Sequence, residues 1–249
     1  MEIKYFCSLG TLCHSSQLLK RNNLKKCSYP FDWIYSDCNT ISHCLQNNFK
    51  IFLDKSYYRE INDMKCGHSY YHKRMFNHHN PLNNKDYNYF LRCVDRFNKL
   101  LQNTESKLFI LMYVNMNHNE IQQSIEFNKI LTKYSSNYKL LIIHHEVKTT
   151  RTYTFEIKDN IHILYLYTLS ESDGKEFKNE DDNLFLDNII NSHYIFKQYS
   201  KNKETIFTLF IKKIMNIIKQ IKMPHLNRML NLFHSYLQGR MHLHEIQKS

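Results

Sequence analysis

The segment Lys107-Leu-Phe-Ile-Leu-Met-Tyr-Val114 decides the fold class of this chain. Its apolar residues follow one another without the polar alternation of a strand that has one solvent-exposed face. A strand buried on both faces is typical of a parallel sheet that helices cover on each side. We therefore predict a sheet layer between two helical layers.

Apolar runs and helical patterns alternate on both sides of this segment. The other runs are residues 3–8, 138–145 and 161–168, and the helical patterns are residues 11–20, 40–48, 87–101, 119–134 and 182–194. Such alternation is typical of α/β domains. The prediction is a three-layer α/β fold with four or five mostly parallel central strands and helices on both faces.

Two stretches depart from this alternation. Residues 54–85 are polar and rich in histidine and aromatic residues, which predicts a long loop. Residues 205–223 have the pattern of a basic amphipathic helix, which Pro224 ends. We predict a catalytic-type α/β domain over residues 1–200 and a basic helical extension over residues 201–249 that packs on it.

Composition excludes several classes of protein. With 42% hydrophobic residues, 16 Phe and 18 Tyr in 249 residues, the chain has material for a core and is not disordered. Only 4 Gly and 3 Pro exclude a collagen-like chain. No apolar run reaches the roughly 20 residues of a membrane span, and no secretory signal is visible. The seven cysteines are odd in number, so we expect reduced thiols and an intracellular protein.

The net charge carries less weight than its size suggests. The chain has 34 Lys and Arg against 23 Asp and Glu, a formal charge of +11. It also has no alanine and much Asn, Lys, Ile and Tyr, which is typical of an AT-rich genome. Part of the lysine excess therefore reflects codon bias, and we do not expect nucleic acid as a partner.

Cys13 is the leading candidate for a catalytic residue. It follows Gly10 in the turn between the first predicted strand and the first predicted helix. Thiols in the first turn of a helix lie near unpaired backbone N–H groups, which favour the thiolate and can stabilise an oxyanion. His14 is a poor base for it because adjacent helical residues point about 100° apart. The alternative is a small, buried, inert cysteine.

Histidines are the candidates for a general base. His78 and His79 lie in the predicted long loop, and His145 ends a predicted strand on the same edge as Cys13. Neighbouring histidines without a C-x-x-C motif do not indicate zinc, so we predict no metal. Glycine-rich cofactor-binding motifs are absent too, and we predict no cofactor.

Other polar residues fit either a site or a structural role. Asp32, between Phe31 and Trp33, can orient a catalytic histidine or cap a turn. Arg92 and Arg96 lie one helical turn apart and can clamp a carboxylate or phosphate, or form a solvated face.

Several of these residues fall in motifs that resemble a known family. The motifs are Ser8-Leu9-Gly10-x-x-Cys13, Leu19-Lys20-Arg21-x-x-Leu24, Ser28-Tyr29-Pro30-Phe31-Asp32-Trp33, Phe76-x-His78-His79 and Arg92-x-x-x-Arg96-Phe97. They resemble a family of bacteria and large DNA viruses described as papain-like cysteine peptidases, over roughly residues 3–190. The resemblance implies a Cys13 nucleophile and a histidine base further along the chain.

Three hypotheses follow for function. The first is a cysteine hydrolase or thiol protease with Cys13, with His78 or His79 as base, Asp32 as orienter, and Gly10, Trp33, Arg92 and Arg96 at the substrate. The substrate, protein or small molecule, stays open. The second is a non-peptidase α/β enzyme of glycan or nucleotide-sugar metabolism. The third is an interaction protein that uses the basic helix of residues 205–223. Composition and resemblance together fit a large DNA virus, which places the protein in the host cytoplasm.

Overall fold

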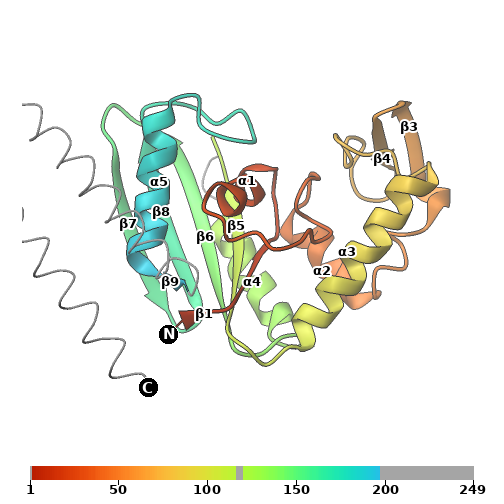
Figure 1. The fold of residues 1–249 in the computed structure, drawn as a ribbon, viewed down its shortest axis with the longest axis horizontal. Coiled ribbons are helices and arrows are strands. Elements are labelled where there is room, and N and C mark those ends of the chain that lie inside the picture. The colour runs from red at the N-terminus through yellow and green to blue at the C-terminus, as the bar shows by residue number, and fades with distance from the viewer. Residues whose placement is uncertain (1, 116–119, 197–249) are drawn as a thin grey trace, which may run out of the picture. The chain divides into compact units, whose positions relative to one another are not determined.

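The centre of the computed structural model, which describes residues 2–115 and 120–196, is a five-stranded sheet (Figure 1). Its strand order is β2 (Tyr5–Ser8), β5 (Lys107–Tyr113), β6 (Tyr138–Val147), β8 (Ile161–Thr168) and β7 (Thr152–Lys158). The first four strands are parallel, and β7 is antiparallel to β8 at one edge. The predicted mostly parallel sheet is confirmed.

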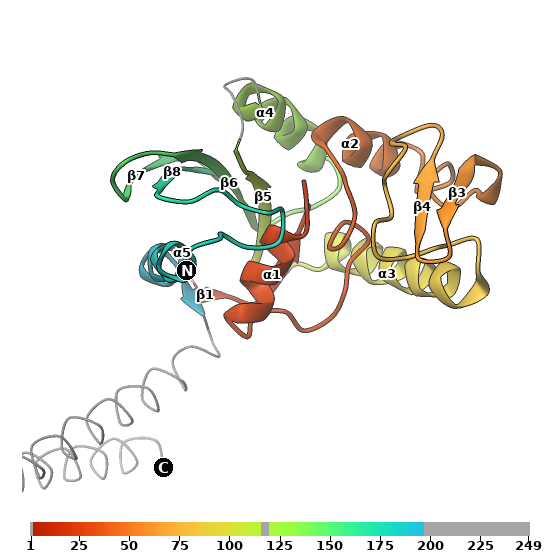
Figure 2. The ribbon, with the colours of Figure 1, turned by 90° about the horizontal axis from the view of Figure 1, so that it is seen from above.

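Helices cover both faces of this sheet, as the alternation predicts. In Figure 2, α1 (His14–Arg21) and α5 (Glu180–His193) lie on one side, and α4 (Glu120–Leu131) lies on the other. A second helix, α2 (Cys38–Gln46), packs against α4. The three-layer α/β architecture is therefore confirmed.

Helix boundaries follow capping side chains. The 19-residue helix α3 (Asn84–Gln102) begins after Asn83, whose side-chain oxygen accepts the backbone N–H of Asp86 at 2.9 Å. In the same way Asp37 caps α2 and Asn179 caps α5. A cap of this kind supplies a partner for an N–H group that has none within the helix.

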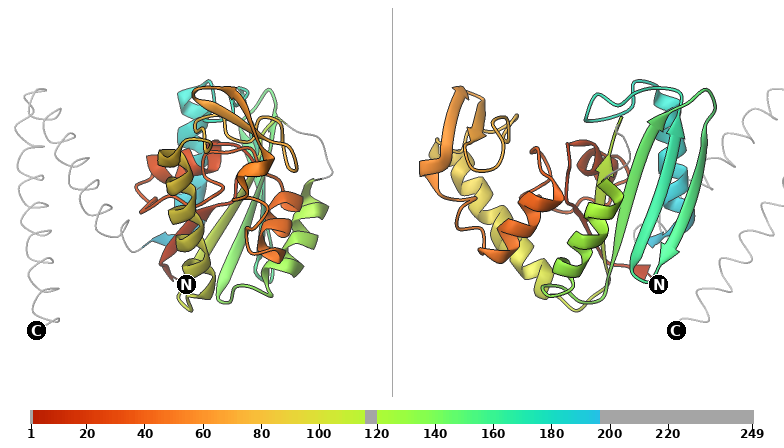
Figure 3. Two further views of the ribbon diagram at one scale, coloured as in Figure 1. Left: turned by 90° about the vertical axis from the view of Figure 1, so that its right-hand side faces the viewer. Right: turned by 180° about the vertical axis from the view of Figure 1, so that it is seen from behind.

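Three features of the chain differ from the sequence-based expectation. The predicted loop of residues 54–85 holds a short 3₁₀ turn (Lys55–Tyr57) and a hairpin of β3 (Tyr58–Asn62) and β4 (Lys65–His68), which lies beside α3 in Figure 3. The strand β7 was not predicted. A small parallel pair, β1 (Glu2–Ile3) with β9 (Ile195–Phe196), joins two distant segments.

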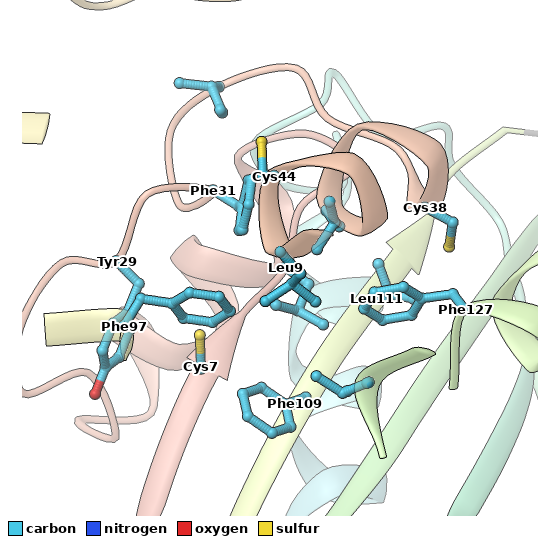
Figure 4. Packing of buried hydrophobic residues seen from close by; sticks show 14 of the residues in the cluster. Cys7, Leu9, Tyr29, Phe31, Cys38, Cys44, Phe97, Phe109, Leu111 and Phe127 are labelled. Carbon is cyan, nitrogen blue, oxygen red and sulfur yellow. The ribbon is translucent and has the colours of Figure 1, made fainter. Parts of the chain in front are cut away.

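A cluster of aromatic rings joins the sheet to α3 and the hairpin. The ring of Phe97 on α3 lies 5.6 Å from that of Phe31 and 6.4 Å from that of Phe109 on β5. Figure 4 shows Phe97, Phe31 and Phe109 in the same buried group as Cys7. Burying a phenyl ring contributes about 1.5–3 kcal/mol, so this cluster binds the parts of the domain into one core.

No helix within residues 2–115 and 120–196 is both long and apolar enough to cross a membrane. The predicted helix over residues 205–223 and the whole predicted extension over residues 201–249 lie outside the described residues.

Candidate active site

The four parallel strands end at one edge of the sheet, where ligands bind in open α/β folds. Each strand delivers polar residues there. Gly10 and Cys13 follow β2, Asn115 follows β5, His145 lies near the end of β6, and Thr168 ends β8. Cys13 therefore lies at the carboxyl edge of the sheet, as predicted, together with residues from three other strands.

Cys13 is the residue that precedes α1, and its side chain is partly exposed. Burial, with a smaller contribution from the carboxylates of Asp173 and Asp32, raises the pKa of the Cys13 thiol to about 11, and Lys175 acts in the opposite direction. The sequence predicts the opposite, a thiolate favoured by the helix N-terminus. Loss of hydration and two nearby negative charges favour the protonated thiol.

His14 lies beside the thiol in sequence but is enclosed by the loop that follows β8. Its Nδ1 is 2.8 Å from the Ser172 hydroxyl, and its ring packs edge-on against Phe177 at 4.6 Å. Its Nε2 is buried without a hydrogen-bond partner among the described residues. Burial lowers the pKa of His14 to about 3, so the imidazole is neutral at pH 7.

Both ring nitrogens of His145 form hydrogen bonds. Its Nδ1 accepts the backbone N–H of Asn115 at 3.3 Å, and its Nε2 lies 2.7 Å from the Thr168 hydroxyl. That hydroxyl donates to the carbonyl of Ser170, so Nε2–H donates to Thr168. Burial lowers the pKa of His145 to about 4. The ring is neutral and fully buried, as a structural imidazole is.

Asn115 connects this edge to the loop after β8, a contact that the sequence did not predict. Its amide nitrogen donates to the carbonyl of Ser172 at 2.8 Å, and its amide oxygen accepts the Ser172 N–H at 3.1 Å. The backbone of Asn115 is left-handed, with φ 57°. An asparagine directly after a buried strand is the signal that points to this position, because Asn tolerates such φ values.

Asp32 is fully buried and bound within its own loop. It accepts the backbone N–H of Tyr29 at 2.7 Å and forms an ion pair with Lys25, whose ammonium also lies 5.5 Å from the Trp33 ring centre. Burial raises the pKa of Asp32, and these partners oppose that shift. In the structure, the Lys25 ammonium thus lies near both the Asp32 carboxylate and the Trp33 ring.

The two histidines of the long loop differ in exposure. The His79 ring stacks on Tyr89 of α3 at 4.6 Å and meets Phe90 edge-on at 5.3 Å, and burial lowers its pKa. His78 is exposed. The two neighbours therefore face different surroundings.

The chain path carries this histidine segment toward the Cys13 turn. Tyr35 donates its backbone N–H to the carbonyl of Met75 at 2.9 Å, and the next residue, Ser36, bridges to Thr11. Residues 35–36 therefore lie between the Cys13 turn and the segment that precedes His78, and they contact both.

The remaining predicted site residues have backbone or surface roles. Arg96 donates to the carbonyl of Ser28 at 3.4 Å and so holds the 25–33 loop to α3, while Arg92 is exposed. Gly10 has φ +94°, and a Cβ there would lie 2.1 Å from the Ser36 hydroxyl. Only glycine fits this crossing of two chain segments.

Two cavities lie away from this edge. One of about 500 Å³ lies between the C-terminal ends of α2 and α3, and one of about 190 Å³ lies between α2 and α4. Cys13 lines neither of them.

Comparisons with known proteins add one finding. No curated protein and no solved structure matches the chain. A family model described as "putative papain-like cysteine peptidase" matches residues 4–148, which is more than half of the chain and includes Cys13, His78, His79 and His145. The match ends just after β6, whereas the motifs indicate a resemblance that extends to roughly residue 190. The chain therefore belongs to this family, on a mostly parallel α/β sheet.

Proposed function

We propose that the protein is a cysteine hydrolase in which the Cys13 sulfur attacks the carbonyl carbon of an amide or ester. Five of the seven cysteines are buried, and Cys13 and Cys27 are partly exposed. Of these two, only Cys13 lies at the start of a helix on the carboxyl edge of the sheet. This position, together with family membership, carries the proposal.

The reaction divides into two steps. In the first, the sulfur–carbon bond forms, the bond to the leaving amine or alcohol breaks, and the thiol proton passes through the base to that leaving group. In the second, water hydrolyses the thioester and restores the thiol. The first N–H groups of α1 have no acceptor within the helix and can stabilise the oxyanion of each step.

We assign the base to His78. A base must reach both thiol and substrate, and among His78, His79 and His145 only His78 is exposed and free of aromatic stacking. The bridges of residues 35–36 support this assignment because they lead its segment past the Cys13 turn. Asp32 acts as a positioning residue through Lys25 and the loop that carries Trp33.

The resting thiol must be activated when substrate binds. A thiol with a pKa of about 11 needs about 5 kcal/mol to ionise at pH 7. Two changes supply part of this energy: the approach of a histidine, and displacement of the Asp173 carboxylate from the thiol. The enzyme is therefore expected to react slowly with small alkylating agents and faster with acylating substrates.

Acylation by p-nitrophenyl acetate tests the proposal. We expect a burst of one equivalent of nitrophenolate and an acetyl group on Cys13 by mass spectrometry. Cys13→Ser removes both, the matched Cys27→Ser control keeps both, and His78→Gln slows acylation roughly a hundredfold. Equal acetylation of Cys13 and Cys27, or an unchanged rate in His78→Gln, contradicts the proposal.

The protonated state of Cys13 favours a second candidate, in which the thiol only lines the pocket of a non-peptidase α/β enzyme. The two candidates differ in the Cys13→Ser variant. Turnover that survives this substitution supports the second candidate, and turnover that disappears while the variant still unfolds cooperatively supports the first.

A further inference from the structure

The cavity between the C-terminal ends of α2 and α3 is separate from the Cys13 edge and has its own chemistry. Its volume is about 500 Å³, within the range of roughly 300–1,000 Å³ typical of small-molecule sites. None of its lining residues carries a charge. A phosphate, carboxylate or ammonium group would find no counter-charge there.

The floor of the cavity is apolar. Leu45 of α2 and Leu101 of α3 form this floor, and Phe49, which follows α2, is buried beneath it. Phe49 and its neighbour Asn48 both have left-handed backbones, with φ 59° and 51°. This turn directs the Phe49 ring into the core and leaves Asn48 at the cavity.

The rim of the cavity is made of groups that both donate and accept hydrogen bonds. It consists of four carboxamides and one phenol, namely Gln46, Asn48, Asn98, Gln102 and Tyr134. None of these side chains hydrogen-bonds to another residue within 2–115 or 120–196. Five unpartnered polar groups around one apolar floor leave their hydrogen-bonding capacity to a ligand or to water.

The helix ends set the polarity of the ligand. Gln46 is the last residue of α2 and Gln102 is the last residue of α3. Both ends therefore carry the negative partial charge of a helix C-terminus, which opposes anions and favours hydroxyl and amide donors. Hydroxyl groups match carboxamides because each can donate and accept, and the C–H face of a sugar ring matches an apolar floor.

We propose that this cavity binds a neutral carbohydrate, whose C–H face lies on Leu45 and Leu101 while its hydroxyl groups pair with the carboxamides of the rim. The site is independent of the proposed hydrolase chemistry. It adds a place where a neutral glycan, free or attached to a larger substrate, is held.

Saturation-transfer NMR with the full chain tests this proposal, with glucose, N-acetylglucosamine, maltose and cellobiose as probes. We expect at least one of them to bind, and the double variant Gln46→Ala/Asn98→Ala to weaken it roughly tenfold, because each lost hydrogen bond costs several-fold in affinity. Gln123→Ala removes an exposed carboxamide of α4 outside this cavity and serves as the control. Glucose 6-phosphate is expected to bind more weakly than glucose.

Three results would overturn the proposal: no binding of any of the four sugars, tighter binding of glucose 6-phosphate than of glucose, or equal weakening by Gln123→Ala and the double variant. The rim side chains make no hydrogen bond to another described residue, so the double variant is expected to fold. Its unfolding midpoint, measured alongside, separates loss of binding from loss of structure. Acylation of Cys13 is expected to be unchanged in it.

Discussion

Cys13 illustrates how a single side chain depends on distant parts of the chain. Its place at the start of α1 follows from local sequence, whereas the groups that set its pKa include Asp173, far along the chain. In the resting protein that carboxylate accepts the backbone N–H groups of Lys175 and Glu176 at 2.8 and 2.9 Å. No local pattern around residue 13 contains this information.

Alkylation kinetics are expected to report the raised pKa of Cys13. A pKa of about 11, against 9.0 for the reference thiol, predicts roughly a hundredfold less thiolate near neutral pH. The iodoacetamide rate at Cys13 should therefore keep rising with pH up to about 11. Asp173→Asn is expected to raise the rate at pH 8, and Asp181→Asn on the exposed face of α5 is expected to leave it unchanged. A rate that levels off near pH 9 contradicts this prediction.

The ion pair of Lys25 and Asp32 is expected to matter more for stability than a surface pair. The Asp32 side chain is fully buried and that of Lys25 nearly so, and removing one partner of a buried pair costs about 3–5 kcal/mol. We therefore expect Lys25→Met to lower the free energy of unfolding by about 3–5 kcal/mol. The control is Lys99→Met, which breaks an exposed pair with Asp95 and should change it by less than about 1 kcal/mol. Urea denaturation checks both, and similar losses would contradict the prediction.

Gly10 is expected to tolerate no side chain. Its φ of +94° disfavours L-residues, and the Ser36 hydroxyl occupies the Cβ position. Gly10→Ala should lower the unfolding free energy by about 2–4 kcal/mol. The double variant Gly10→Ala/Ser36→Gly removes the clash and should recover part of the loss. Thermal unfolding measures both, and no recovery would show that the backbone conformation alone accounts for the cost.

At the scale of elements, the buried strands of the central sheet were predictable, and the exposed strands β7 and β3 were not. Residues 107–113 of β5 are all buried, so their apolar run is continuous. The unpredicted β7 is at an edge and mostly exposed, and four of the five residues of β3 are exposed. Strands of this kind need few apolar residues, because a partner strand supplies their hydrogen bonds.

Helix α3 offers a matched pair of asparagines. Asn83 caps the helix, whereas Asn88 lies exposed within it. Asn83→Ala is expected to lower the unfolding free energy by about 1 kcal/mol because the Asp86 N–H loses its acceptor. Asn88→Ala is expected to raise it by a few tenths of a kcal/mol because alanine is the better helix former. Chemical denaturation should show opposite signs, and equal signs would contradict the prediction.

At the scale of the whole molecule, buried neutral histidines are expected to make the domain sensitive to acid. Burial lowers the pKa of His14 to about 3 and those of His145 and His162 to about 4, against 6.5 for the reference imidazole. Below pH 6.5 the unfolded chain binds protons that the folded chain does not, so stability falls as pH falls toward 4. At pH 5 each histidine costs about 2 kcal/mol.

Urea titrations at pH 7 and pH 5 measure this loss. His162→Gln is expected to reduce the difference between the two midpoints. The raised pKa of Asp32 acts in the opposite direction, since its folded form holds a proton more readily, and it offsets part of the loss. Equal midpoints at the two pH values would contradict the prediction.

The pairing of β2 with β5 also shapes how the molecule is made. Tyr5 lies opposite Lys107, so about a hundred residues must be synthesised before the first strand of the sheet meets its neighbour. The segment from β5 to β8 can assemble over much shorter separations. Closing a long loop is entropically costly and slow. During synthesis, the turn that bears Cys13 therefore has no paired strand beside it until β5 has been made, and the edge that bears Cys13 forms late in folding.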